Sequence, residues 1–230
     1  MGIITNALSI IGGVLLGTIL KGKLSNKLCV ICGISVIILS AVGFLENIFL
    51  VTSQSLSNDS LIILILALII GYLFGEALKL EDKINSLSKG NNDKTPVFIS
   101  TSLFFIVGGL EISGPILLAL NGDNSMLYLK SLVDFPFAII FGSLYGFKAL
   151  LSAFPTALIQ VSLFLLAKLC GDLIPTTCLK QLCALGYIIL LFSGYNLLVD
   201  EKHKIKNTNM LPAFFLILIY NVTVKLVEIL

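Results

Sequence analysis

Long apolar segments recur along almost the whole chain and constrain its fold more than any single motif does. An α-helix needs about 20 residues to cross a bilayer, and we expect such spans near 4–20, 28–50, 61–78, 97–120, 127–147, 150–170, 179–199 and 209–228. With 57% hydrophobic and 12% charged residues, the chain has too little polar surface for a soluble globular protein. The sequence therefore predicts an all-α, polytopic bundle of transmembrane helices.

The predicted spans fill residues 1–230 and leave no room for a separate soluble domain, so we expect one integral membrane domain. The number of spans is seven or eight, because the fifth segment is charged at both ends, by Lys130 and Asp134 at its start and Lys148 at its end. The longest polar run, 86–96, is predicted to be a solvated loop.

An internal repeat is one interpretation of the order of the segments. Residues 24–40 and 178–193 have a similar rhythm, and each is the second segment of a trio, in halves 1–85 and 149–230 around a central 97–147. With eight spans the trios run in opposite directions, as in the inverted repeats of many secondary transporters. With seven spans they run in parallel, and chance similarity between two apolar helices is the alternative.

The lysines predict the orientation. All 15 basic residues are lysine, and they concentrate in the loops 21–27, 79–96 and 200–208, whereas the loops 51–60 and 121–126 have none. Lysine near the ends of spans is retained on the cytoplasmic side. In the eight-span topology both termini then lie outside.

Glu111 is the first candidate for a functional residue, because it lies midway along the apolar segment 97–120. An ionisable side chain at bilayer depth indicates function by default. Gly108, Gly109, Gly114 and Pro115 surround it and are expected to interrupt the helix, which would expose backbone groups to a ligand. Glu111 would bind a cation or exchange a proton; alternatively, it pairs with a buried lysine in a structural role.

Two further charges and two amides complete the predicted site for a substrate or ion. Lys130 and Asp134 are four residues apart and face the same way on a helix. They form either an interfacial salt bridge or part of a gate. Asn6 and Asn196, like Gln160 and Asn221, either line a pathway or hydrogen-bond across helices.

Glycines at i and i+4 form three pairs that predict close helix packing. At this spacing both members lie on one face of a helix, where another backbone can approach. We expect contacts inside the bundle or between subunits, with a glycine-lined path as the alternative, at Gly13 and Gly17, Gly71 and Gly75, and Gly142 and Gly146.

Catalysis and cofactors find little support in the sequence. It has no Gly-x-Ser-x-Gly, His-Glu-x-x-His or Walker motif, and no arginine to clamp a phosphate. Cys29 and Cys32 have the spacing of metal ligands, but a structural zinc site needs four ligands. We therefore expect no enzyme activity, no cofactor and no metal centre, and the dispersed lysines give no case for nucleic acid.

Several segments together resemble a family of bacterial membrane proteins catalogued as domain of unknown function 554. The resemblance covers nearly the whole chain and is carried by Thr5-Asn6-Ala7, Gly13 and Gly17, Val107-Gly108 and Gly114, Lys130-Ser131 and Asp134, Gly194-x-Asn196-Leu197, Lys204-Ile205-Lys206, and Leu211-Pro212. It implies an integral membrane protein without an established activity. It also implies a glutamate at the position of Leu117 and a small or apolar residue at that of Glu111.

These observations predict a multi-pass protein of the bacterial inner (cytoplasmic) membrane, in contact with lipid and assembled as a homo-oligomer, with a dimer favoured. We expect it to act as a secondary transporter or channel for a small ion or metabolite, through a site near Glu111. A non-transporting scaffold or regulatory subunit is the alternative.

Overall fold

The computed structural model describes the chain except residues 22–25, 53–58, 89–100, 103, 107–108, 170–173 and 230. The described part is helical and contains no strand, which confirms the all-α class. Its helices are α1 (Gly2–Ile19), α2 (Asn26–Thr52), α3 (Asp59–Ala77), α4 (Leu80–Ser88), α6 (Gly109–Asn121), α7 (Ser125–Tyr145), α8 (Ala153–Leu169), α9 (Thr176–Asn196) and α10 (Pro212–Ile229), with short 3₁₀ turns η1 (Gly146–Ser152), η3 (Glu201–His203) and η4 (Asn207–Met210).

Five helical stretches of the described chain are long and apolar enough to cross a membrane: Gly2–Ile19, Val30–Ile48, Ser125–Leu169, Thr177–Asn196 and Asn207–Lys225. Leu61–Ala77 and Leu110–Asn121 are shorter apolar helices. Helix is the expected form for these sequences, because lipid offers no partner to an unpaired backbone N–H or C=O group. Ser125–Leu169 contains two helices, α7 and α8, joined through η1. The exact number of spans stays a prediction.

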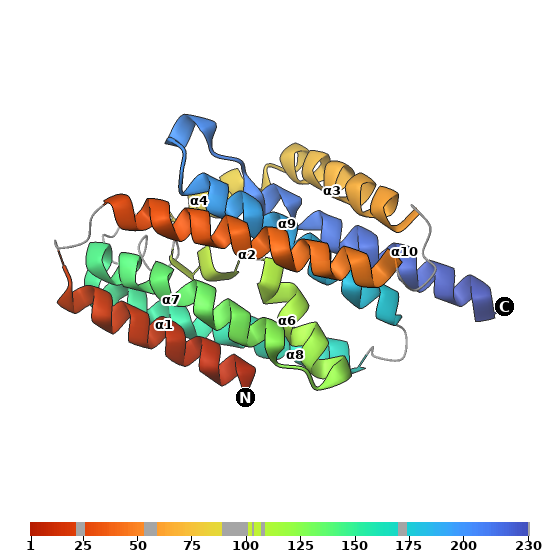
Figure 1. The fold of residues 1–230 in the computed structure, drawn as a ribbon, viewed down its shortest axis with the longest axis horizontal. Coiled ribbons are helices and arrows are strands. Elements are labelled where there is room, and N and C mark those ends of the chain that lie inside the picture. The colour runs from red at the N-terminus through yellow and green to blue at the C-terminus, as the bar shows by residue number, and fades with distance from the viewer. Residues whose placement is uncertain are drawn as a thin grey trace.

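The helices form two groups with α6 between them (Figure 1). One group contains α1, α7 and α8, and the other contains α2, α3, α9 and α10. Each has a buried apolar core, and α6 contributes Leu110 to the first core and Ile116 to the second. Both groups therefore pack against the short helix α6, and they also contact each other directly, because the first core includes Val36 of α2 and Tyr187 of α9.

Glycines allow α1 and α7 to approach each other closely. A Cβ atom on Gly13 would lie 2.6 Å from the Cβ of Ala138, and one on Gly17 would collide with the backbone oxygen of Ile139. In return, a Cβ on Gly142 would meet the backbone oxygen of Val14. The two helices run parallel in close contact and hold the side chains between them in fixed register.

Glycines also allow close contacts between the helices of the second group. A Cβ on Gly71 of α3 would lie 2.6 Å from the backbone nitrogen of Ala213, and one on Gly75 would meet the backbone oxygen of Asn209. On α2 and α9, a Cβ on Gly33 would lie 3.0 Å from the oxygen of Gly194. The second helices of the proposed trios thus pack together, and so do the third ones, while the repeat itself stays a prediction.

Gly146 makes no close helix contact within the described part of the chain, and a contact between subunits stays a prediction. A Cβ at this position would meet nothing within 4 Å, and the backbone has a φ of +64°. Gly146 ends α7 in a conformation that side chains with a Cβ rarely adopt. The i, i+4 rule assumed that the helix continues through Gly146, and it stops one residue earlier.

The helix α6 also differs from the expected interruption. It begins at Gly109 and continues through Gly114 and Pro115 to Asn121, so neither of these two residues breaks it. Pro115 is inside α6, beyond the first four residues whose N–H groups have no intrahelical acceptor, so it removes one intrahelical hydrogen bond without ending the helix. Gly108 lies outside the described residues. The predicted loop 86–96 likewise begins later, because residues 86–88 belong to α4 and 89–96 are outside the described residues.

Candidate functional site

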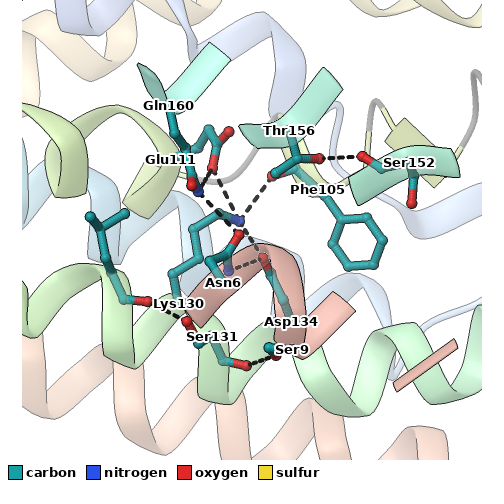
Figure 2. Close-up of polar contacts among 11 residues, drawn as sticks. Asn6, Ser9, Phe105, Glu111, Lys130, Ser131, Asp134, Ser152, Thr156 and Gln160 are labelled. Carbon is teal, nitrogen blue, oxygen red and sulfur yellow. Dashed lines mark hydrogen bonds and ion pairs between the residues drawn. The ribbon is translucent and has the colours of Figure 1, made fainter. Parts of the chain in front are cut away.

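Five polar side chains from four helices meet in the interior, where α6 packs against the first helix group (Figure 2). They are Asn6 of α1, Glu111 of α6, Lys130 and Asp134 of α7, and Gln160 of α8. All are buried, with exposed fractions from 0% to 4%. The structure thus brings together four of the five residues predicted to bind a substrate or ion, and we call this cluster the Glu111 network.

Lys130 is the centre of the network. Its Nζ lies 2.8 Å from Asp134 Oδ2 and 3.6 Å from Glu111 Oε2. It also donates a hydrogen bond of 2.9 Å to the backbone oxygen of Phe105. An ammonium group has three N–H donors, so these three contacts can use all of them. The i, i+4 spacing places Lys130 and Asp134 on the same side of α7, and Glu111 of α6 supplies the second carboxylate.

The two carboxylates have different surroundings. Asp134 Oδ2 accepts from both Lys130 Nζ and Asn6 Nδ2, the latter at 2.8 Å. Glu111 Oε2 accepts from Gln160 Nε2 at 2.7 Å, and the ammonium of Lys130 is more distant from it. Asp134 is therefore the closer ionic partner of the lysine, and Glu111 is held chiefly by a neutral amide.

Gln160 connects the two carboxylate branches. Its Nε2 donates to Glu111 Oε2 at 2.7 Å and to Asn6 Oδ1 at 3.1 Å. Both contacts require the nitrogen on this side, because an amide oxygen there would face two acceptors. The sequence marked Gln160 as a polar residue in an apolar segment but could not say which helix it faces.

Two oxygen atoms in the network have no hydrogen-bond partner among the described residues. They are Glu111 Oε1 and Gln160 Oε1, and both atoms are buried. A buried acceptor without a donor typically costs about 1 to 3 kcal/mol. Native structures seldom leave such atoms unpaired, and those that do often mark a site for a ligand, ion or water.

The charges of the network do not balance. Two carboxylates share one ammonium, so the fully ionised cluster carries one net negative charge in an apolar interior. An uncompensated charge away from water is far more costly than a paired one. One added positive charge, a proton or a small cation, would neutralise the cluster. The arrangement is therefore suited chemically to exchanging a single positive charge.

A metal centre of several carboxylate, thiolate or imidazole ligands is not formed by the described residues, which contain no group of three His, Cys, Asp or Glu side chains close enough to share an ion. Within the network, the ammonium of Lys130 lies between the two carboxylates. Cys32 is buried, and the side chain of Cys29 is outside the described part.

Asn196, the fifth predicted residue, is not part of the network. It lies at the end of α9, where its amide donates to the backbone oxygen of Ile205 at 2.8 Å and accepts from the backbone nitrogen of the same residue at 2.8 Å. This paired contact fixes the loop that follows α9. Asn221 is also elsewhere and donates to Gln181 Oε1 at 2.7 Å between α10 and α9.

The glycine-rich segment around Glu111 serves to place α6. Glu111 is in the first turn of the helix that begins at Gly109, and Gly114 lies next to Leu127 of α7. A Cβ on Gly114 would be 2.9 Å from Leu127 Cδ2, so the glycine allows α6 and α7 to approach. Leu117, six residues after Glu111, is partly buried and packs against both apolar cores.

Sequence comparison agrees with the membrane character of the fold. The chain is 29% identical over 220 residues to "Uncharacterized membrane protein YdfK" of Bacillus subtilis (strain 168), covering 94% of this chain and 93% of the relative. It is 28% identical over 229 residues to "Uncharacterized protein YqgA" of Escherichia coli (strain K12), with 94% of each chain covered. No solved structure matches. Residues 1–222 match the family described as "Protein of unknown function (DUF554)", so the chain belongs to the DUF554 family of membrane proteins.

Proposed function

We propose that this protein is a secondary transporter or channel for a small ion or metabolite, and that the Glu111 network is its ion-exchanging site. The observation that carries the proposal is the unequal charge of the network, in which two buried carboxylates share one ammonium and Glu111 Oε1 has no donor. A purely structural ion pair would be expected to be balanced, because an extra buried charge weakens the fold.

The position of the network along the helices supports this function. Asp134 lies near the middle of α7 (Ser125–Tyr145), and Gln160 lies near the middle of α8 (Ala153–Leu169). In a helix of membrane-spanning length, these two positions are close to the centre of the bilayer, whereas Asn6 is in the second turn of α1. Ionisable groups at this depth are rare and mark ion pathways or proton relays in many membrane proteins.

The proposal also covers the membrane in which the protein lies and its orientation there. We infer a multi-pass protein of the bacterial cytoplasmic membrane, oriented with the lysine-rich loops inside. Without a nucleotide site or other catalytic motif in the sequence, flux would follow an ion gradient or the gradient of the substrate, and no enzyme activity is proposed.

A homo-oligomer is also proposed, although the glycine pairs no longer argue for it. Gly13, Gly17 and Gly142 are used between α1 and α7, and Gly71 and Gly75 between α3 and the segment 209–213. Any contact between subunits would have to use other surfaces. The mass of the detergent-purified protein, measured by light scattering with the detergent subtracted, tests this part separately.

The second candidate function is a membrane scaffold or regulatory subunit. It is favoured by the closure of the network, in which Asn6, Glu111 and Gln160 are 0% exposed and Lys130 has contacts for each of its donors. In this view the cluster specifies helix packing and exchanges nothing. The two functions differ in one respect that can be measured, namely whether a ligand recognises the cluster.

Ligand-dependent thermal stability of the detergent-purified protein distinguishes them. A ligand that binds only the folded state raises its apparent stability. The panel contains monovalent and divalent cations, amines and small carboxylates at several pH values, with wild type compared with Glu111→Gln. Asn221→Ala is the control, because it removes a buried polar contact between α9 and α10 without touching the network.

Transport predicts a ligand that stabilises wild type and Asn221→Ala but not Glu111→Gln. If no ligand stabilises the wild type, and Glu111→Gln is simply less stable than wild type, the scaffold function is the better account. A ligand whose effect survives in Glu111→Gln would keep transport but move the site elsewhere.

A further inference from the structure

One face of α8 and the preceding turn η1 is polar in an otherwise apolar segment. Ser152, Thr156 and Gln160 are four residues apart, and each is 0% exposed. At this spacing the three side chains lie on one side of a helix, with about 6 Å between successive residues along its axis. Gln160 belongs to the Glu111 network, so this polar face begins at the proposed ion-exchanging site (Figure 2).

We propose that the Ser152, Thr156 and Gln160 face of α8 is a proton route between Glu111 and the end of the bundle where α7 meets η1. The inference rests on the proposed function, because it names the proton as the ion that the Glu111 network exchanges. Under this proposal the hydroxyl groups of Thr156 and Ser152 carry protons, in addition to making their hydrogen bonds to the backbone.

The hydroxyl groups of Thr156 and Ser152 each donate to the backbone and are still able to accept a hydrogen bond from water. Thr156 Oγ1 donates to the backbone oxygen of Ser152 at 2.8 Å, and Ser152 Oγ donates to the backbone oxygen of Ala149 at 2.6 Å. Each hydroxyl oxygen can still accept a hydrogen bond. Successive residues are roughly 6 Å apart along the helix axis, about the span of two hydrogen bonds, and the proposed route places one water between each pair.

The two oxygen atoms of the network that lack a donor indicate that the route carries a proton and contains water. Glu111 Oε1 and Gln160 Oε1 are buried acceptors without a donor. A proton bound to Glu111 gives Oε1 a hydrogen and removes the surplus negative charge of the network. A water that reaches Gln160 from Thr156 gives Gln160 Oε1 a donor. The same arrangement thus accounts for both orphaned atoms.

The opposite direction along the helices is closed by apolar packing. Leu127 is 0% exposed and lies one turn before Lys130 and Ser131 on α7. A Cβ on Gly2 of α1 would lie 2.7 Å from Leu127 Cβ, and one on Gly114 of α6 would lie 2.9 Å from its Cδ2. The helices α1 and α6 therefore pack tightly against Leu127 of α7, whereas towards η1 the buried polar residues continue from Gln160 to Thr156 and Ser152.

The proposed step moves one proton and changes no other bond. A hydronium ion at the η1 end gives its proton to the first water of the chain. Each water and each hydroxyl of Ser152 and Thr156 in turn passes a proton to its neighbour, and the last water, held by Gln160 Oε1, gives its proton directly to the carboxylate of Glu111, which becomes a carboxylic acid. Release is the reverse of this sequence, so charge and atoms balance without a redox partner.

Infrared spectroscopy of the Glu111 carboxyl tests the route without any known substrate. The C=O band of a protonated carboxyl that is present in wild type and missing in Glu111→Gln identifies the group. Rapid dilution into D₂O then shifts this band at the rate at which the carboxyl exchanges its proton. The test variants are Thr156→Val, which keeps the shape of the side chain, and Ser152→Ala.

Ser162→Ala is the matched control. Ser162 is on the exposed side of α8, and its Oγ donates to the backbone oxygen of Leu158 at 2.8 Å, as Thr156 does to Ser152. We expect Thr156→Val and Ser152→Ala to slow the exchange about tenfold, the effect on a rate of one lost hydrogen bond of ordinary net strength. Ser162→Ala should exchange as fast as wild type.

Exchange at the wild-type rate in both test variants would overturn the route, and so would the absence of any carboxyl band that depends on Glu111. These results are distinguishable from failure of the proposed function. If no ligand stabilises the protein but the exchange is slowed as expected, transport fails and the proton route stands. If a ligand depends on Glu111 but the exchange is unchanged, only the route fails.

Discussion

Lys130 Nζ lies 2.8 Å from Asp134 Oδ2 and 3.6 Å from Glu111 Oε2, so one ammonium serves two carboxylates unequally. Asn6 adds a second donor to the same Asp134 oxygen, whereas one oxygen of Glu111 has none. The two acids should therefore respond differently to neutralisation, although they are almost equally buried.

Asp134→Asn should destabilise the protein by about 3 to 5 kcal/mol, because it leaves the buried ammonium of Lys130 without its close partner. Glu111→Gln should change stability by less than about 1 kcal/mol or increase it, because it removes the surplus charge and keeps an acceptor for Gln160 Nε2. Thermal unfolding of both variants in one detergent checks the order. Equal losses would contradict the unequal sharing of the lysine.

Lys130→Met should be the most harmful change in the network, since it leaves two buried carboxylates without a cation. The double variant Lys130→Met with Asp134→Asn should recover part of the loss, because it removes both members of the 2.8 Å pair. For a buried, hydrogen-bonded pair, a coupling energy of about 1 to 3 kcal/mol is expected between the two changes. Strict additivity in a double-mutant cycle would show that the pair does not interact in the folded protein.

Much of the fold could be predicted from hydropathy, because lipid leaves an apolar chain few alternatives to helix. Seven of the eight expected spans correspond to one helix each, from α1 to α10. The segment 97–120 is the exception, because α6 begins only at Gly109. The expectation that Gly114 and Pro115 would break this helix came from residue type alone, whereas α6 packs against α7, α8 and α9 and stays helical through both residues.

The candidate site was only partly predictable. Glu111, Lys130 and Asp134 could be found in the sequence because a charge in an apolar segment is costly and therefore conspicuous. Residue type alone did not separate Asn6 and Gln160, which join the network, from Asn196, which fixes a loop. These amides differ only in which helices pack against them, and that information lies in the tertiary structure.

Gly17→Ala should destabilise the protein by about 1 to 3 kcal/mol, because the added Cβ collides with the backbone oxygen of Ile139 and would force α1 away from α7. Gly12→Ala is the matched control on the same helix, since the nearest atom to its added Cβ is 3.9 Å away, on Phe135. Alanine favours helix over glycine, so this control should be neutral or slightly stabilising. A pair of variants with equal thermal stability would rule out close packing of α1 on α7 at Gly17.

Outside the spans, Glu81 should make stability fall with rising pH. Burial raises the pKa of this carboxyl above 4.5, although Oε2 accepts a hydrogen bond of 3.1 Å from the backbone nitrogen of Thr208. A group whose pKa is higher in the folded state contributes stability that is present below its unfolded pKa and is lost as the pH rises through the folded pKa. Wild type should therefore lose stability relative to Glu81→Gln as the pH rises above 4.5.

Asp82, the next residue, provides a control of opposite sign. Its hydrogen bond to Lys206, 2.7 Å long, lowers its pKa below 3.8, so the contribution of this exposed pair is lost as the pH falls. Thermal unfolding of wild type, Glu81→Gln and Asp82→Asn across the acid range separates the two. The difference between wild type and Glu81→Gln should grow towards neutral pH, and that between wild type and Asp82→Asn should shrink towards low pH. If the first difference were independent of pH, Glu81 would have the same pKa in the folded and unfolded protein, and its burial against η4 would carry no ionic cost.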